Sequence, residues 1–196
     1  GSDSFTYEAN DGTLASNIAT VTIAVTAVND APTISDIADL SIAEDSNTGA
    51  LAFTVGDLET AAGSLTVSAV SSNPTLLPDA NLVFGGVGAN RTITATPVAD
   101  GNGVSTVTVT VSDGSLSGTD SFVLTVTVVN DAPVAAADSY STNEDTVLNI
   151  AASGVLANDT DVDLNALTAV LVSGPTNGAL TLNANGSFSY TPNADF

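Results

Sequence analysis

Apolar and polar residues alternate along several short stretches of the chain. Residues 106–111 alternate Thr with Val. Phe122, Leu124, Val126 and Val128 recur at every second position and alternate with Ser121, Thr125 and Thr127, and residues 21–25 repeat this pattern. Because successive side chains of a strand point to opposite faces, a period of two predicts strands with one buried face. No stretch has sustained helical spacing, so we predict an all-β fold.

Turn signals separate these stretches. Asp113-Gly114 stands between the two longest alternating segments, and Asp11-Gly12 holds the corresponding place near the amino terminus. Residues 179–182 and 187–190 flank another turn signal, which predicts a hairpin. Roughly seven short strands per 100 residues, with frequent turns, indicate an immunoglobulin-like Greek-key β-sandwich.

An internal repeat sets the domain organisation. The sequence Val-Asn-Asp-Ala-Pro occurs at residues 28–32 and again at residues 129–133. The spacing of about 100 residues suits a complete small domain. We therefore predict tandem Ig-like sandwiches: one complete domain over 31–130, flanked by two halves of a second domain.

The two flanking halves follow from the matched positions. Residues 1–30 have the pattern of the last two strands of a sandwich, and residues 131–196 have the pattern of the first part of the next one. The matches are Glu44-Asp45 with Glu144-Asp145, Leu65 with Leu167, residues 96–100 with 191–195, Phe5 with Val107, Tyr7 with Val109, and Asp11 with Asp113.

The composition is strongly acidic. The chain has 22 Asp and Glu residues against one basic residue, Arg91, which gives a formal charge of −21. This charge excludes nucleic acid and anionic membrane as sensible partners. No apolar run approaches the roughly 20 residues of a membrane helix, so we expect no membrane insertion. Arg91 is expected to pair with a nearby acid.

The residue types also argue against catalysis. The chain has no His, Cys or Lys, so the usual general base and the thiol and amine nucleophiles are missing. Paired carboxylates can hydrolyse glycosides, but no Trp platform accompanies them here. We therefore expect the chain not to be an enzyme.

Several motifs resemble a known family. Glu44, the Asp57-x-Glu59 pair, residues 109–114 and the repeated Val-Asn-Asp-Ala-Pro resemble cadherin-type repeats. Residues 3–7, 143–146 and 156–159 more narrowly resemble bacterial cadherin-like tandem repeats of large secreted or surface adhesins (the VCBS and RTX-adhesin type). This resemblance spans the chain and implies an extracellular location at the bacterial cell surface.

Acidic and amide residues are expected at the two ends of the complete sandwich, where its loops lie. The candidates at one end are Asn29, Asp30, Asp57, Glu59 and Asp113; those at the other are Glu44, Asp100, Asn130 and Asp131, to which the next domain adds Asp159, Asp161 and Asp163. Matching positions in the repeat add Asp11, Glu144 and Asp195.

These oxygen ligands predict Ca²⁺. Two carboxylates about 5 Å apart repel by roughly 3 kcal/mol at an effective dielectric near 20, a penalty that a bound cation removes. Ca²⁺ accepts carboxylate, amide and backbone oxygens, whereas zinc and copper prefer His and Cys ligands. The alternative is that these residues serve only as turn formers and as a soluble acidic surface.

We expect a calcium-stiffened extender or scaffold that acts in adhesion or biofilm formation. The alternative is a ligand- or carbohydrate-binding adhesive domain, which would need an exposed aromatic cluster or an inserted loop. Aromatic residues make up 5% of the chain, and most fall within predicted strands. The structural role is therefore the favoured hypothesis.

Neighbouring copies of the repeat are the expected partners. Either a continuous chain of repeats completes the split domain, or separate molecules complement each other head to tail and form a filament. We favour the continuous chain. Both assemblies predict that Phe5 and Tyr7 pack beside Phe188 or Tyr190 of a neighbouring copy.

Overall fold

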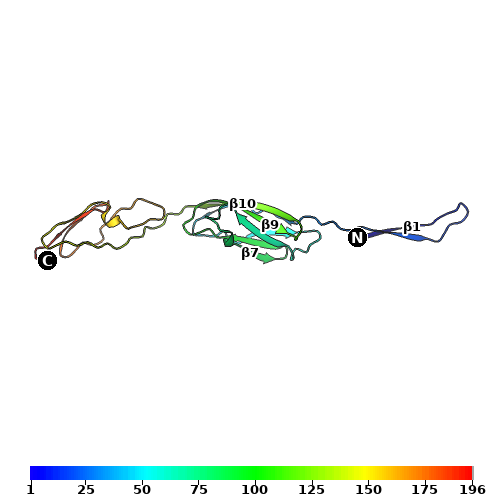
Figure 1. Ribbon diagram of the computed structural model, residues 1–196, viewed down its shortest axis with the longest axis horizontal. Coiled ribbons are helices and arrows are strands. Elements are labelled where there is room, and N and C mark those ends of the chain that lie inside the picture. The colour runs from blue at the N-terminus through cyan, green and yellow to red at the C-terminus, as the bar shows by residue number, and fades with distance from the viewer. Residues whose placement is uncertain (196) are drawn as a thin grey trace. The chain divides into compact units, whose positions relative to one another are not determined.

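The computed structural model describes residues 1–195 and contains strands and two short 3₁₀ turns (Figure 1). The chain divides into two compact units, Gly1–Val128 and Val129–Phe196. Its strands form four sheets. The predicted all-β, Ig-like fold is confirmed, whereas the division into one complete and two partial domains stays a prediction.

The first unit contains a complete sandwich of two four-stranded sheets. One sheet has the order β4-β10-β9-β6 and the other the order β3-β5-β8-β7. The strands are β3 (Thr33–Ile34), β4 (Leu40–Ala43), β5 (Leu51–Gly56), β6 (Thr66–Ser71), β7 (Leu82–Val87), β8 (Asn90–Ala95), β9 (Gly103–Ser112) and β10 (Ser117–Thr127). A 3₁₀ turn at Asp79–Asn81 precedes β7. All pairs are antiparallel except β4 with β10, which is parallel.

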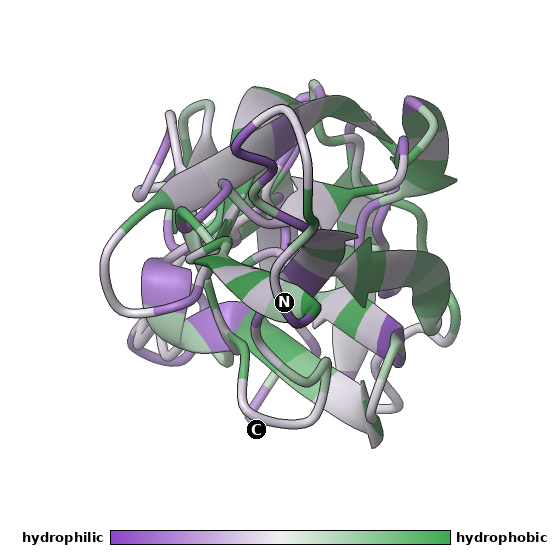
Figure 2. Ribbon diagram, turned by 90° about the vertical axis from the view of Figure 1, so that its right-hand side faces the viewer, coloured by the Kyte–Doolittle hydropathy of each residue, from purple (hydrophilic) through white to green (hydrophobic). Residues whose placement is uncertain are grey.

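The alternating residues of β9 and β10 form much of the core. Val107, Val109 and Phe122 are completely buried, and they pack in one cluster with residues such as Phe53 and Ile93 of the other sheet. Hydrophobic and polar bands alternate along the strands in Figure 2. Burying each of these side chains contributes roughly 1.5–3 kcal/mol, so this face holds the two sheets together.

The same unit also contains a separate two-stranded hairpin near the amino terminus. Strand β1 (Ser2–Tyr7) pairs antiparallel with β2 (Ala19–Ala24), and Phe5 stands opposite Val21. None of the residues 1–31 is buried. The apolar side chains of this hairpin therefore lie largely in solvent.

The second unit contains a three-stranded sheet with the order β11-β13-β12. Its strands are β11 (Leu148–Ile150), β12 (Gly178–Leu182) and β13 (Phe188–Pro192), with a 3₁₀ turn at Gly154–Leu156. The Tyr140 and Phe188 rings meet edge to face, with their centroids 5.1 Å apart. Among residues 129–195 only Gly154 and Gly186 are buried, so this unit has no closed apolar core.

Arg91 forms no ion pair with the acids of residues 1–195, contrary to expectation. Its guanidinium donates to the backbone carbonyl oxygens of Gly88 (2.8 Å), Ala62 (3.1 Å) and Leu65 (3.4 Å). These carbonyls belong to the loop between β5 and β6 and to the turn between β7 and β8. The expectation was wrong because free carbonyl oxygens in nearby loops occupy the donors of this cation.

Gly118 fixes the approach of the linker to the sandwich. It lies in β10, and a Cβ atom at this position would collide with the carbonyl oxygen of Pro32. Pro32 is buried and closes the Val-Asn-Asp-Ala-Pro motif. The absence of a side chain at residue 118 therefore lets the motif lie directly against the last strand.

We expect Gly118→Ala to lower the free energy of unfolding by about 1–3 kcal/mol, because either the linker or β10 must shift. Gly63→Ala is the matched control, since a Cβ atom there would meet nothing within 4 Å. Urea denaturation followed by far-UV circular dichroism compares the two variants. Equal midpoints would contradict the close packing of Pro32 against β10.

Candidate functional site

Side chains from three segments meet at the start of the complete sandwich. The amide nitrogen of Asn29 donates to the Asp113 carboxylate at 2.7 Å. The backbone N–H of Asp30 donates to the Glu59 carboxylate at 3.2 Å. These bonds tie the segment before β3 to the loop after β5 and to the β9–β10 turn. The structure thus brings together five residues that the sequence assigned to one end of the domain.

Asp57 supplies the least satisfied oxygen of this group. Its Oδ1 atom accepts hydrogen bonds from the backbone N–H groups of Glu59 (2.9 Å) and Thr60 (2.6 Å). Its Oδ2 atom is buried and receives no hydrogen bond from the described residues. A buried carboxylate oxygen without a donor is costly. A cation at this oxygen would remove that cost, so the residues fit a metal ion.

The Asp113 carboxylate is held in its ionised form by hydrogen bonds. The backbone N–H of Leu116, the Asn29 amide and the backbone N–H of Ser115 lower the pKa of Asp113 below its ordinary value of 3.8. Asp11 occupies the same place in the β1–β2 hairpin. There the backbone N–H of Leu14 and the hydroxyl of Thr13 lower the pKa of Asp11 to about 2.

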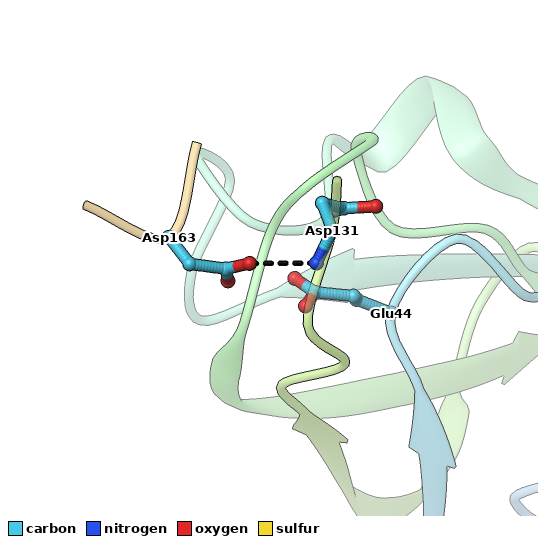
Figure 3. Close-up of side chains that lie close together, drawn as sticks. All are labelled: Glu44, Asp131 and Asp163. Atoms are coloured by element: carbon cyan, nitrogen blue, oxygen red, sulfur yellow. Dashed lines mark hydrogen bonds between the residues drawn. The ribbon is translucent and has the colours of Figure 1, made fainter. Parts of the chain in front are cut away.

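A second group of acids and amides lies within the second unit. The backbone N–H of Asp131 donates to the Asp163 carboxylate at 2.7 Å (Figure 3). The Asn165 side chain donates to the amide oxygen of Asn130 at 2.7 Å, and its backbone N–H donates to Asp161 at 3.1 Å. Asp159 accepts the backbone N–H of Ala136 at 2.8 Å.

These residues surround a cavity in the second unit. Its volume is about 370 Å³, and its polar lining residues include Asn130, Asp131, Asp159, Asp161 and Asn165. Two backbone hydrogen bonds between Val134 and Thr160, of 2.8 and 3.0 Å, join two of the segments that line it. Carboxylate and amide oxygens thus line one small cavity, as an oxygen-ligated cation requires.

The two groups share the same construction. In both, the Asn of the repeated motif donates from its side chain to the carbonyl oxygen of the next Asp, at 3.2 Å for Asn29 and 2.8 Å for Asn130. In both, the backbone N–H of that Asp is bound by an acid of the following loop, Glu59 or Asp163. The repeated sequence therefore folds in the same way twice.

Four further candidates are Glu44, Asp100, Glu144 and Asp195. Glu44 is 5% exposed and its N–H donates to the Thr127 carbonyl, whereas Glu144 and Asp195 are exposed. The backbone N–H of Asp100 donates to Asp45 at 3.0 Å. The assignment of all the candidates as metal ligands stays a prediction.

Sequence reasoning missed two residues. Asp45 binds the loop of Asp100, and Asn165 binds both Asn130 and Asp161. The Glu-Asp pair that recurs at 44–45 and 144–145 was the available signal for Asp45. A list of acids cannot find Asn165, because an amide after an acidic run looks like an ordinary turn residue.

Comparison with known proteins finds two bacterial domain families that match the chain. The profile of the bacterial Ig domain matches residues 29–127, which is the complete sandwich with its linker. The chain belongs to the bacterial Ig domain family. The profile of the bacterial cadherin-like domain matches residues 130–196. The predicted resemblance to cadherin-like and Ig-like repeats of bacterial adhesin-type proteins is therefore confirmed.

Several solved structures are similar to this chain. The extracellular cadherin domains 1–5 of protocadherin gamma B2 are 18% identical, with a TM-score of 0.52 over 99% of this chain and 40% of that chain. A chimeric titin Z1Z2 is 16% identical, with a TM-score of 0.40 over 53% of this chain and 100% of that one. Domains 4 and 5 of the S-layer protein SbsC are 18% identical, with a TM-score of 0.37 over 56% and 58%. No curated protein matches the sequence.

Bacterial Ig-like and cadherin-like domains are typically non-catalytic structural modules found outside the cell or on its surface. Within residues 1–195 no helix has the length and apolar character needed to cross a membrane.

We expect Asn29→Ala to raise the pKa of Asp113, because the variant loses one of the hydrogen bonds to the carboxylate. The pKa of Asp11 serves as the internal control, since its turn has no such amide partner. A depressed pKa contributes stability that is present above the unfolded pKa and is lost as the pH falls through the folded pKa. The variant therefore loses stability above pH about 4 and resembles the parent at lower pH. Carboxyl NMR titration in calcium-free buffer measures both groups, and an unchanged Asp113 pKa would contradict the assigned hydrogen bond.

Proposed function

We propose that this chain is a non-catalytic, calcium-stiffened structural repeat of a bacterial extracellular adhesin or surface filament. It acts as an extender or scaffold in adhesion or biofilm formation. The observation that carries the calcium proposal is the buried, unsatisfied Oδ2 atom of Asp57 within a group of acids. The family membership supports the structural role.

The donor set at the first site suits Ca²⁺. Asp57, Glu59 and Asp113 offer carboxylate oxygens. Asn29 makes both of its hydrogen bonds through the amide nitrogen, which leaves its amide oxygen as a neutral ligand. Ca²⁺ takes six to eight such oxygens in flexible geometry, so water would complete its coordination.

The cavity of the second unit provides the second proposed site. Asp159, Asp161 and Asp163 project from one short loop, and Asn130 and Asp131 come from the linker motif. The acids at every second position supply more negative charge than the Asp57-x-Glu59 pair of the first site.

Stiffening follows from the position of these residues along the chain. In both groups the linker motif is bound to the loop of the domain that follows it. A cation that bridges the two would replace weak N–H contacts with strong ionic ones and would neutralise the mutual repulsion of the acids. The linker would then lose its freedom to swing as a hinge.

Calcium titration tests the proposal. We expect isothermal titration calorimetry to detect the heat of calcium binding. We also expect a higher melting temperature, since a ligand present at 100 times its dissociation constant stabilises the folded state by about 2.7 kcal/mol. Asp57→Asn and Asp159→Asn should each weaken one site by at least about tenfold. Asp36→Asn is the charge-matched control, because Asp36 is exposed and lies outside both groups.

Removal of calcium with EDTA can contradict the calcium proposal. If EDTA leaves the melting temperature unchanged, calcium does not stabilise the fold. If Asp36→Asn reduces calcium affinity as much as Asp57→Asn does, calcium acts only through the general charge of −21. Small-angle scattering with and without calcium then measures stiffness directly, and equal flexibility would exclude the stiffening role.

A further inference from the structure

Arg91, the only basic side chain of the sequence, lies at one end of the complete sandwich. It stands directly opposite Phe53 of β5 and Gly86 of β7 in the sheet. Because side chains alternate along a strand, Arg91 shares the face of Ile93 and Ala95, which are completely buried. The half-buried Arg91 therefore occupies the first core-facing position of β8.

The guanidinium of Arg91 ties two loops together. Its Nε atom donates to the carbonyl oxygen of Gly88, in the turn between β7 and β8, and its Nη2 atom donates to those of Ala62 and Leu65, in the loop between β5 and β6. The same turn accepts the backbone N–H of Val55 at 2.9 Å, so it lies beside the end of β5. A planar guanidinium donates in fixed directions, so this side chain sets the place of the loop relative to the turn.

The loop that Arg91 holds carries two acids of the first candidate metal site. Residues 57–65 include Asp57 and Glu59 near their start and end at the buried Leu65. The Asp57 carboxylate accepts two backbone N–H groups and so orders the first turn of the loop. The bonds from Arg91 hold the second half of the loop, so both halves are fixed to the sandwich.

The position of this loop decides whether the linker motif is bound. Glu59 accepts the backbone N–H of Asp30 at 3.2 Å, and this bond joins the loop to the motif. Asp57 contributes the buried oxygen that receives no hydrogen bond from the described residues. A displacement of the loop would move both carboxylates away from the linker.

We propose that Arg91 is a positioning residue for the first candidate calcium site. It holds the β5–β6 loop in the place where Glu59 reaches the N–H of Asp30 and where Asp57 joins the group of acids. Arg91 itself is not a ligand. This inference rests on the proposed calcium function, because a cation is what would bind the ligands that the loop presents.

The charge of Arg91 and its hydrogen bonds have opposite effects on calcium binding. A positive charge repels Ca²⁺, so by Coulomb's law alone the loss of Arg91 should tighten binding. Loss of the hydrogen bonds should weaken binding, because the ion must then order a released loop. Residues that orient metal ligands typically change the affinity by about 10–100-fold. The direction of the change therefore distinguishes positioning from electrostatics.

Amide exchange in EDTA tests the position of the loop without calcium. Arg91→Met keeps an apolar stem at the core-facing position but removes every donor. We expect the backbone N–H of Asp30 to exchange with water several times faster in this variant, because Glu59 no longer stays within reach. The N–H of Val123 in the other sheet, which donates to Asp39 at 2.6 Å, is the internal control and should exchange at the parent rate. NMR measures both amides.

Calcium titration measures the consequence for the site. The reference chain carries Asp159→Asn, which weakens the second site, so that calorimetry reports the first. We expect Arg91→Met in this background to weaken calcium binding by about tenfold. Asn90→Ala is the matched control, because Asn90 is exposed in the same strand. It should change neither the calcium affinity nor the exchange of the Asp30 amide.

Arg91→Lys is the conservative variant. It keeps the charge and can donate to some of the three carbonyl oxygens, but it lacks the planar fork of donors. We expect it to lie between the parent and Arg91→Met in amide exchange and in calcium affinity. The same two measurements on Arg91→Lys carry the test if Arg91→Met does not fold.

Three results would overturn the proposal. They are an unchanged exchange of the Asp30 amide in both Arg91 variants, an equal acceleration at Asp30 and Val123, and calcium binding that is equal or tighter in Arg91→Met. If the Asp159→Asn chain itself binds no calcium, the proposed function fails at the first site. The exchange of the Asp30 amide in EDTA then decides alone whether Arg91 positions the loop.

Discussion

The fold depends on one constraint: the apolar face of each sheet must be covered by the apolar face of another sheet. In the complete sandwich, the β9–β10 hairpin meets this requirement, and Val107, Val109 and Phe122 are lost from solvent entirely. The chain has no disulfide that could replace this contact. In the described part of the second unit, residues 129–195, no second sheet covers the first. Residues 168–173 alternate as a strand does but form no strand, and apolar side chains stay exposed. Burial of the apolar face of the β9–β10 hairpin therefore holds the complete sandwich together.

The same architecture places the acidic residues. In a sandwich the strands run from end to end, so their loops and the linker motif meet at the ends. Asn29 reaches Asp113, and Asp30 reaches Glu59, although each pair is far apart in the sequence. The free energy gained by burying the apolar core holds these loops in place, so the acids stay close together despite their repulsion. The proposed metal sites are therefore a consequence of how the ends of the sandwich are built.

Much of this was predictable because the information is local. Alternating residues predicted β9, β10, β12 and β13, and the loop positions of a Greek-key sandwich predicted which acids meet at its start. Other features depend on tertiary contacts that no pattern encodes. Residues 168–173 alternate as β6 does but form no strand, because a strand needs a hydrogen-bonded neighbour. The unsatisfied oxygen of Asp57 and the carbonyl partners of Arg91 depend on loop geometry. A search for acidic residues does not find amides such as Asn165, because they carry no charge.

The proposed calcium binding depends on ionic conditions. Binding of Ca²⁺ to Asp57 or Asp159 is electrostatic, so monovalent salt that screens the carboxylates weakens it. The same salt weakens the mutual repulsion of the acids, so a bound ion adds least to stability at high salt. The stiffening proposed for the linker motifs is consequently greatest where divalent cations are present and monovalent salt is low.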